Sequence, residues 1–479
     1  MKIGVISLGC PKNLVDTEVM LGLTERAGHT VTPDLAEADV LLVNTCAFIE
    51  AARRESIDAI LEMAEHKKRG PRRRLVVAGC LAERYRAELQ AQIPEIDAML
   101  GTDEVPEIVN AIDGGRSAGQ PPLLQIRRRP DAERVGADTP SEAVEVRPSA
   151  GRGLVGRRTA RPTYLYDGDA PRILTTPGHL AYVKVAEGCD YACSFCIIPR
   201  LRGAYRSRTV QSVVQEARVL AARGVREIVL VSQDTTFYGV DRGERGALPR
   251  LLRELNRIPD LRWIRLLYLY PTTIGDGTLD AVAECDKVCK YVDLPLQHAS
   301  NRVLRRMGRP GTRSSYERLL GRIRARIPGV TLRTTFIVGF PGETAEDFEE
   351  LCGFVRQVGF DHLGVFTYSH EEETAAHQLG DDVPTRVKRQ RRGQLMALQK
   401  RLVARANRKR VGETVQVMVD GPSPDHGLVL RGRLQSQAPE IDPVVYLTEA
   451  DPATLGPGDL LKARIVGARG YDLVARPLP

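Results

Sequence analysis

The stretch VAEGCDYACSFCIIPRLRGAYRSR, residues 185–208, contains the cysteines that decide the fold of this chain. They are Cys189, Cys193 and Cys196, in a CxxxCxxC spacing. A four-iron cluster that is held entirely by protein takes four thiolates. Three thiolates would leave one iron open to a ligand that is not protein, and an open iron favours chemistry over simple electron transfer. We therefore predict that these three cysteines are iron ligands and catalytic residues.

Two plainer interpretations of the three cysteines stay open. A zinc site is one of them, although zinc prefers a closed tetrahedral set of four ligands and no fourth ligand stands nearby in the sequence. Packing of small apolar side chains in a core is the other, and it would make the spacing a coincidence.

Length and composition indicate several folded units in a globular protein. The chain has 479 residues, of which 42% are hydrophobic and 27% are charged. About two to four domains are expected for that length. No run of eighteen apolar residues occurs, so no membrane-spanning helix is predicted. The first residues, MKIGVISLGCPKN, read as a strand without a cleavage site behind it, so we predict a cytoplasmic location and no membrane partner.

Cysteine count and charge add two further expectations. Nine cysteines in a reducing compartment are more often metal ligands, nucleophiles or core residues than disulfides. The 69 Lys and Arg residues exceed the 61 Asp and Glu residues by 8. A positive charge of this size over such a length favours an anionic partner, such as RNA or a ribosome, only weakly.

Residues 179–384 alternate apolar segments with helical patterns, at intervals of about thirty to forty residues. This pattern predicts a partial (β/α)6 barrel of the TIM type, in which the working face is the rim at the carboxyl ends of the strands. The stretch EGCDYACSFC (187–196) follows the first of these strands, so its cysteines are expected on that rim. The predicted strands lie in residues 179–188, 227–234, 263–271, 291–297, 331–340 and 362–369.

Residues 1–113 repeat one design three times: an apolar, β-branched run ends in a cysteine and a helical pattern follows. The cysteines are Cys10, Cys46 and Cys80. Runs this apolar predict parallel strands that are buried on both faces of an α/β domain. Ligand sites in such sheets lie beyond the carboxyl ends of the strands, so the three cysteines should meet at one edge and hold a second cluster. Three buried cysteines without a ligand are the alternative.

The other segments differ in composition. Residues 114–178 are rich in Arg, Pro, Gly and Asp without a clear period, which predicts a linker or insertion that is partly disordered. Residues 385–411 predict a basic connecting helix, which either contacts RNA or is solvated. Residues 412–479 predict a small antiparallel β-barrel. This last segment has six basic and nine acidic residues.

A CxxxCxxC motif on the loop after the first strand of a parallel barrel resembles the radical S-adenosylmethionine superfamily. The resemblance implies that S-adenosylmethionine binds the open iron, and that the reduced cluster splits its sulfonium bond to yield an adenosyl radical that removes hydrogen from carbon. It also implies that Phe195 lies against the adenine, and that Val338 and Gly339 in TTFIVGFPGET (334–344) line the adenosine. An ordinary strand-to-helix turn explains the last motif almost as well.

The motifs GCPKNLVDTE (9–18), NTCAFIEAA (44–52) and AGCLAERY (78–85), together with the CxxxCxxC motif and a C-terminal barrel of the TRAM type, resemble the radical methylthiotransferases over essentially the whole chain. The resemblance implies two 4Fe-4S clusters, of which the second handles sulfur. It implies two S-adenosylmethionine molecules, and an electron donor such as flavodoxin or ferredoxin. The implied ligands are Cys189, Cys193 and Cys196 for one cluster and Cys10, Cys46 and Cys80 for the other.

The loops SQDTTFYG (232–239) and DLPLQHAS (293–300), with IIPRLRGAYRSR (197–208), resemble the branch that modifies ribosomal protein S twelve, free or in the small subunit. The implied reaction is methylthiolation at the β-carbon of an aspartate. The alternative is a tRNA adenosine methylthiotransferase of the same family. A non-catalytic electron carrier is a third possibility, and it would require four thiolates for each cluster. An acidic C-terminal domain favours a basic protein over RNA.

Five further residues have weaker expectations. Asp234 and His298 follow strands on the working rim and are candidates to orient substrate or a proton, or else they form hydrogen bonds within their loops. Cys285 and Cys289 have the spacing of one helix face, and Cys352 lies in an amphipathic helical pattern. We expect these three cysteines to pack in the core.

Overall fold

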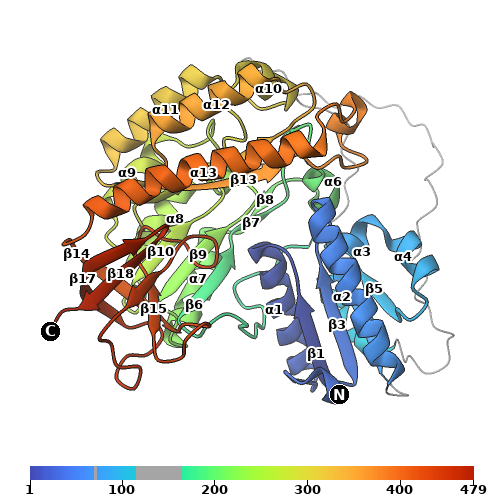
Figure 1. Ribbon diagram of the computed structural model, residues 1–479. Coiled ribbons are helices and arrows are strands. Elements are labelled where there is room, and N and C mark those ends of the chain that lie inside the picture. Colours follow the sequence, from blue (N-terminus) through green and yellow to red (C-terminus); the bar gives the residue numbers. More distant parts are fainter. Residues whose placement is uncertain (70–72, 115–163) are drawn as a thin grey trace, which may run out of the picture.

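The computed structural model describes residues 1–69, 73–114 and 164–479. Three parts pack together (Figure 1): an N-terminal α/β domain, drawn in blue, a central barrel, drawn from green to orange, and a small C-terminal barrel, drawn in red. Residues 115–163, most of the predicted linker, lie outside the described residues. Residues 164–178 form no helix or strand, but Arg172 in this segment bonds to Glu18 of the N-terminal domain at 2.6 Å, so the segment is packed rather than loose.

The N-terminal domain has a five-stranded sheet in the order β2-β1-β3-β4-β5, and all its pairs are parallel. Helices α1 and α5 cover one face of the sheet, and α2 and α4 cover the other. Burial on both faces explains the continuous apolar runs. The elements are β1 (Lys2–Ser7), α1 (Pro11–Arg26), β2 (Thr30–Val31), β3 (Val40–Thr45), α2 (Glu50–Lys68), β4 (Arg74–Gly79), α3 (Cys80–Arg84), α4 (Arg86–Gln92), β5 (Ala98–Leu100) and α5 (Ile108–Asp113).

The central part is an open barrel of six parallel strands, in the order β6-β9-β10-β11-β12-β13. Two three-stranded sheets form it, and a parallel bridge between Ile264 and Val288 joins them. The prediction of a partial six-stranded barrel is therefore confirmed. Its strands are β6 (Leu180–Lys184), β9 (Glu227–Val231), β10 (Trp263–Leu266), β11 (Tyr291–Asp293), β12 (Thr331–Val338) and β13 (His362–Thr367).

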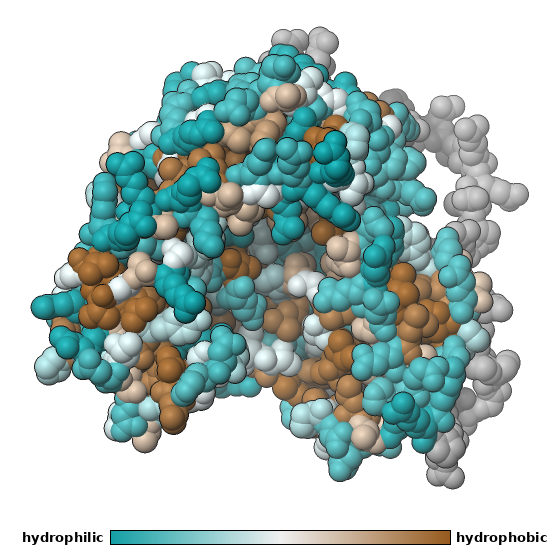
Figure 2. Space-filling model, viewed as in Figure 1, coloured by the Kyte–Doolittle hydropathy of each residue, from teal (hydrophilic) through white to brown (hydrophobic). Residues whose placement is uncertain are grey.

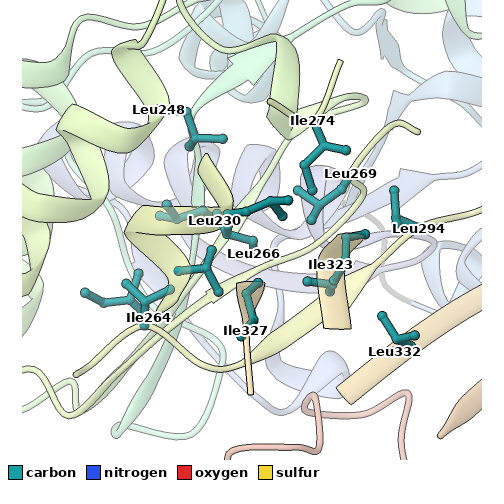
Figure 3. Packing of buried hydrophobic residues seen from close by; sticks show 14 of the residues in the cluster. Leu230, Leu248, Ile264, Leu266, Leu269, Ile274, Leu294, Ile323, Ile327 and Leu332 are labelled. Atoms are coloured by element: carbon teal, nitrogen blue, oxygen red, sulfur yellow. The ribbon is translucent and has the colours of Figure 1, made fainter. Parts of the chain in front are cut away.

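Helices cover the outside of this barrel. Figure 3 shows the core between strands and helices, where Leu266 and Leu332 from the strands meet Ile323 and Ile327 of the helix layer. Complete burial of such leucine and isoleucine side chains contributes about 1.5–3 kcal/mol each. The helices are α7 (Val210–Ala222), α8 (Ala247–Asn256), α9 (Asp276–Glu284), α11 (Arg313–Arg326) and α12 (Ala345–Val358).

Helix α13 (Thr385–Lys409) crosses the central barrel and leads into the C-terminal barrel (Figure 1). The predicted small barrel is confirmed and is closed in the order β14-β15-β16-β18-β17. One of its strand pairs, β16 with β18, is parallel and the others are antiparallel. The strands are β14 (Thr414–Pro422), β15 (Leu430–Arg433), β16 (Val445–Leu447), β17 (Leu460–Arg469) and β18 (Asp472–Pro477). No helix of the described residues is long and apolar enough to cross a membrane.

The cysteines expected in the core are buried, but two of them are not on a helix. Cys285 is 5% exposed, Cys289 is 1% exposed and Cys352 is 5% exposed. Helix α9 ends at Glu284, so the predicted helix face for Cys285 and Cys289 is wrong. The reason is a competing backbone partner, because the Cys289 amide donates to the Ile264 carbonyl of β10 at 2.9 Å.

Buried ion pairs attach the C-terminal barrel to the base of the central barrel. The Arg433 guanidinium lies 2.7 Å from the carboxylate of Glu227, the first residue of β9, and 2.9 Å from Asp420. Arg265 donates to Glu227 at 2.8 Å. Burial favours a raised pKa for Glu227, but Arg433 and Arg265 outweigh it and hold the pKa below its usual value. The contact lies at the amino ends of the strands, opposite the working rim.

This interface pairs some of the acidic side chains of the C-terminal segment with partners inside the molecule. Asp420 pairs with Arg433, Glu440 accepts a hydrogen bond from Tyr182 at 3.1 Å, and Asp442 accepts one from Tyr291. Glu440 is exposed, so Asp420 and Asp442 are the two of the nine acidic residues that are used inside the molecule, together with one of the six basic residues, which leaves seven against five. The acidic excess of the surface is therefore smaller than the sequence count, and its attraction for a basic substrate stays a prediction.

We expect Arg433→Leu to lower the free energy of unfolding by about 3–5 kcal/mol, because it leaves buried carboxylates with incomplete pairing. Urea denaturation measures the effect. Arg476→Leu is the matched control, since Arg476 lies 3.8 Å from Glu449 with both side chains well exposed, and its loss should cost at most about 1 kcal/mol. An equal decrease in the free energy of unfolding in the two variants would show that the buried pairs contribute no more stability than an exposed pair.

Candidate functional site

The six cysteines of the two predicted clusters lie where the N-terminal domain meets the rim of the central barrel. The loop with Cys189, Cys193 and Cys196 leaves the carboxyl end of β6 through β7 (Ala186–Glu187) and runs into α6 (Ile198–Arg202). Figure 1 shows α6 and β7 next to the N-terminal domain, and Figure 2 shows the surface hollowed between the three parts. Two other surface cavities, between α7 and α8, contain none of these cysteines.

Cys10, Cys46 and Cys80 follow the carboxyl ends of three neighbouring strands, β1, β3 and β4. The carboxamide of Asn13 ties the loops of Cys10 and Cys46 together, because it donates to the Leu8 carbonyl at 2.9 Å and to the Thr45 carbonyl at 2.8 Å. The parallel order of the strands therefore brings three cysteines, separated by as many as seventy residues of chain, to one edge of the sheet.

Gly9 allows the first two of these loops to approach each other. Its backbone has a φ of +94°, a conformation that residues other than glycine rarely adopt. A Cβ at this position would lie 2.7 Å from the Cβ of Cys46 and 3.1 Å from its sulfur. A side chain here would push Cys10 and Cys46 apart, so glycine before the cysteine is a requirement of this geometry.

The thiols of this first group influence one another. Burial, together with the neighbouring Cys80 and Cys10, raises the pKa of Cys46 to about 12. Burial also raises the pKa of Cys80, although Arg202 opposes it. The pKa of Cys10 is lowered, because Lys12 and Arg202 together outweigh burial. Three thiolates in this space would repel one another unless cationic groups or metal ions lay among them.

The second group of thiols behaves in the same way. Burial raises the pKa of Cys189 to about 12, with Cys193 adding to it. The pKa of Cys196 is raised by burial and then by Cys193. Arg309 is the nearby cation, with a guanidinium nitrogen 3.7 Å from the sulfur of Cys193.

The donor set of each group fits an iron–sulfur cluster. All six cysteines are free thiols. Within the described residues, no three or more Cys, His, Asp or Glu side chains are drawn together tightly enough to hold one metal ion. In a multi-iron cluster each thiolate would bind a different iron, so its three ligands need not converge on one ion. The role of the cysteines as ligands remains a prediction.

A buried ionic network joins the two groups. Arg202, at the end of α6, donates to Asp16 at 3.1 Å and to Glu187 at 2.8 Å. The same guanidinium donates to the Asn13 carboxamide oxygen at 2.8 Å and lies 3.6 Å from the sulfur of Cys80. Lys184 bonds to both carboxylates as well. The segment that carries Cys189, Cys193 and Cys196 is thus anchored on the loops that carry the other three.

Aromatic side chains line the rim beside the second group. The rings of Tyr191 and Tyr270 stack at 3.9 Å, and the Arg309 guanidinium lies over Tyr270 at 4.2 Å from the ring centroid. The Tyr191 hydroxyl donates to Asp234 at 2.7 Å. This arrangement holds the CxxxCxxC loop against the ends of the barrel strands.

Asp234 and His298 are both fully buried. Asp234 accepts a hydrogen bond from the Thr236 amide of its own loop at 2.8 Å, so the structure favours the loop-bonding alternative for this residue. It also accepts bonds from Tyr191 and Thr273 of other loops, at 2.7 Å and 3.0 Å. The Nδ1 atom of His298 accepts the Ser300 amide at 3.0 Å. Burial lowers the pKa of His298 to about 3, so its imidazole is neutral at physiological pH.

The residues predicted to line the cofactor lie near the carboxyl ends of β6 and β12, and Val338 belongs to the core between strands and helices. Phe195 packs against a small cluster that includes Met307, Phe340 and Tyr368. Val338 is fully buried. A Cβ at Gly339 would lie 2.3 Å from the Lys388 side chain, so the glycine is explained by the approach of α13. Contact of Phe195, Val338 and Gly339 with S-adenosylmethionine remains a prediction.

Sequence reasoning missed several residues of this site. Arg202, Tyr191 and Arg309 stand in or near the quoted motifs, but their partners are distant along the chain. Tyr268 and Gln297 have left-handed backbones, with φ values of 59° and 71°. Left-handed backbone conformations in residues other than glycine are strained and are common at functional sites, and no sequence pattern predicts them. One usable signal was present, because glycine precedes Cys10, Cys80 and Cys189.

Models of three known families match successive parts of the chain. Residues 2–101 match the family described as Uncharacterized protein family UPF0004. Residues 183–355 match the Radical SAM superfamily, and residues 411–478 match the TRAM domain. Among solved structures, the chain is similar to the radical S-adenosylmethionine methyltransferase TsrM from Kitasatospora setae with cobalamin and a 4Fe-4S cluster bound. The TM-score is 0.53 at 20% identity, over 76% of this chain and 71% of that chain, which shows the fold alone.

Two curated relatives match along nearly the whole chain. The ribosomal protein uS12 methylthiotransferase RimO of Koribacter versatilis is 46% identical over 487 residues, which cover 100% of this chain and 96% of the relative. The enzyme of the same name from Symbiobacterium thermophilum is 47% identical over 474 residues, which cover 99% and 90%. Identity at this level over the full length shows that this chain belongs to the RimO family of methylthiotransferases, enzymes of the radical S-adenosylmethionine superfamily.

Proposed function

We propose that this enzyme attaches a methylthio group to the β-carbon of an aspartate in ribosomal protein S twelve. The observation that carries the proposal is the full-length identity of 46% and 47% to relatives named for that activity. The two groups of three free thiols, joined by the Arg202 network, support the chemistry that those names describe.

In this proposal Cys189, Cys193 and Cys196 hold one 4Fe-4S cluster, and Cys10, Cys46 and Cys80 hold the other. When bound, the two clusters and two S-adenosylmethionine molecules supply the radical, the sulfur chemistry and the methyl group. Phe195, Val338 and Gly339 would lie along the adenosine. The side chains that hold these groups in place are called the frame here; they are Asp16, Lys184, Glu187, Arg202, Tyr191 and Tyr270.

The frame has two tasks. Arg202, Lys184, Asp16 and Glu187 fix the distance between the two cysteine groups, since each cation bonds to both carboxylates. The stacked Tyr191 and Tyr270 rings, with the hydrogen bond from Tyr191 to Asp234, hold the loop of the second group against the barrel rim.

Partners and location belong to the same proposal. A small electron-transfer protein such as flavodoxin or ferredoxin would reduce the clusters, and the substrate would be S twelve, free or in the small subunit, in the cytoplasm. The alternative substrate, tRNA, finds support in α13, whose exposed basic side chains offer a surface for phosphates. These side chains are Arg386, Arg389, Arg392, Lys400, Arg401, Arg405, Arg408 and Lys409.

Incubation of the reduced, reconstituted protein with S-adenosylmethionine and either purified S twelve or tRNA separates the two substrates. We expect mass analysis to find one added methylthio group on an aspartate of S twelve and none on the tRNA. A methylthio group on tRNA alone would overturn the proposed substrate while leaving the reaction class intact.

Cys193→Ala should abolish formation of 5′-deoxyadenosine, and should lower the iron content from about eight to about four atoms per chain, because one cluster of two loses a ligand. Cys80→Ala should lower the iron content equally but retain the cleavage of S-adenosylmethionine. Cys352→Ala is the matched control, since Cys352 is a buried free thiol in α12, and it should keep both. Cleavage that survives in Cys193→Ala would refute the assignment of ligands.

A further inference from the structure

Lys12 carries a buried cation without a carboxylate partner. The residue is 8% exposed and stands in the first turn of α1. Its ammonium donates to the Ser232 carbonyl at 3.3 Å and lies 3.6 Å from the centroid of the Tyr268 ring. Among the residues that the structure describes, no carboxylate lies within ion-pair distance of Lys12, although pairs are present for its neighbours.

The contrast with those neighbours is informative. Lys184, which is also buried, pairs with Asp16 and Glu187, and Arg202 pairs with the same two carboxylates. A buried charge without a partner costs several kcal/mol unless other groups compensate. One carbonyl and one aromatic face stabilise an ammonium only in part. Apart from the Cys10 thiol, whose pKa Lys12 lowers, the described residues supply no negatively charged group that would complete the surroundings of Lys12.

The position of the Lys12 ammonium indicates where a negatively charged partner would bind. Ser232 follows the carboxyl end of β9 and Tyr268 follows the carboxyl end of β10. Lys12 itself is two residues from Cys10. The ammonium therefore lies between the first cysteine group and the working rim of the barrel. Tyr268 holds its ring there from a backbone with a φ of 59°, a strained conformation of the kind found at ligand sites.

We propose that Lys12, with the face of Tyr268, binds the side-chain carboxylate of the aspartate that is modified. The inference rests on the proposed function, and deepens it by naming the group that recognises an acidic substrate. The reacting β-carbon is bonded directly to that carboxylate carbon, so an ion pair with Lys12 would fix the reacting carbon beside the first cysteine group. An adenine base has no carboxylate and would leave the ammonium unpaired.

The competing explanation is that Lys12 only balances negative charge on a cluster held by Cys10. The two explanations differ in what they predict for the substrate. A lysine that binds the substrate carboxylate distinguishes aspartate from asparagine, which has the same shape without the charge. A cation that serves the cluster changes the spectrum or iron content of the protein and leaves that distinction untouched.

The test compares wild type, Lys12→Met and Lys12→Arg as reconstituted full-length proteins. The probes are S twelve and S twelve in which the modified aspartate, identified on the wild-type product by mass analysis, is replaced by asparagine. Equilibrium binding of both forms is measured, together with iron content and the visible absorption of the clusters. Lys388→Met is the matched control, because Lys388 is buried and lies near a tyrosine ring but pairs with Asp381 at 2.5 Å.

We expect wild type to bind the aspartate form about tenfold to a hundredfold more tightly than the asparagine form, as a charge-assisted hydrogen bond would require. Lys12→Met should bring that ratio close to one, whereas Lys12→Arg should keep most of it and Lys388→Met should keep all of it. Should Lys12→Met fail to assemble clusters, Lys12→Gln, which keeps a polar end without the charge, replaces it with the same expectation.

A binding ratio in Lys12→Met or Lys12→Gln that equals that of wild type would overturn the inference, and a changed cluster spectrum would then assign Lys12 to the cluster. Failure of the proposed function looks different, because wild type would then leave S twelve unmodified. That result would remove both proposals together.

Discussion

The active assembly depends on four buried charges that come from three separate segments. Arg202 and Lys184 face Asp16 and Glu187, and none of the four residues is more than 5% exposed. Each cation contacts both carboxylates, so the charges balance locally. Burial favours a raised pKa for Glu187, but Arg202 and Lys184 outweigh it and lower that pKa, which keeps the carboxylate ionised. Such a network gains little net stability over apolar packing, but it breaks at a high cost when one member is lost. Its benefit here is geometric, because it sets one distance between the two cysteine groups.

An open barrel needs neighbours, and the two flanking domains provide them. Six strands do not close, so the inner face would be exposed to water without a cover. One hydrophobic cluster contains Val19 from α1, Tyr182 and Tyr291 from barrel strands, and Ala438 from the C-terminal segment. The C-terminal barrel is therefore a structural part of the enzyme at the base of the strands, while the N-terminal domain covers the rim. This division leaves the hollow between the three parts for the substrate.

The features that sequence could predict are local, and those that it could not are made by distant partners. The strands of both sheets follow from continuous apolar runs, and Cys10, Cys46 and Cys80 were expected at one edge because parallel strands end together. The partners of Arg202 lie up to 189 residues away along the chain, and the ion pairs of Arg433 join two domains. Nothing in the local pattern distinguishes an acid that pairs inside the molecule, such as Asp420, from an exposed one, so net charge alone overstates the acidity of the C-terminal surface.

Whether a buried polar group is satisfied separates the frame of this site from its working parts. Asp234 looked catalytic from its position after a strand, but its carboxylate accepts hydrogen bonds from Tyr191 and Thr273 and has little capacity left for a substrate. Lys12 looked like one residue of a family motif, but its ammonium is buried and no described carboxylate pairs with it. Folding rewards pairing of every buried charge, so a chain that leaves one unpaired at the rim retains that cost for a reason outside its own fold. By the same criterion the paired cations, Arg202 and Lys184, position the cysteines rather than the substrate.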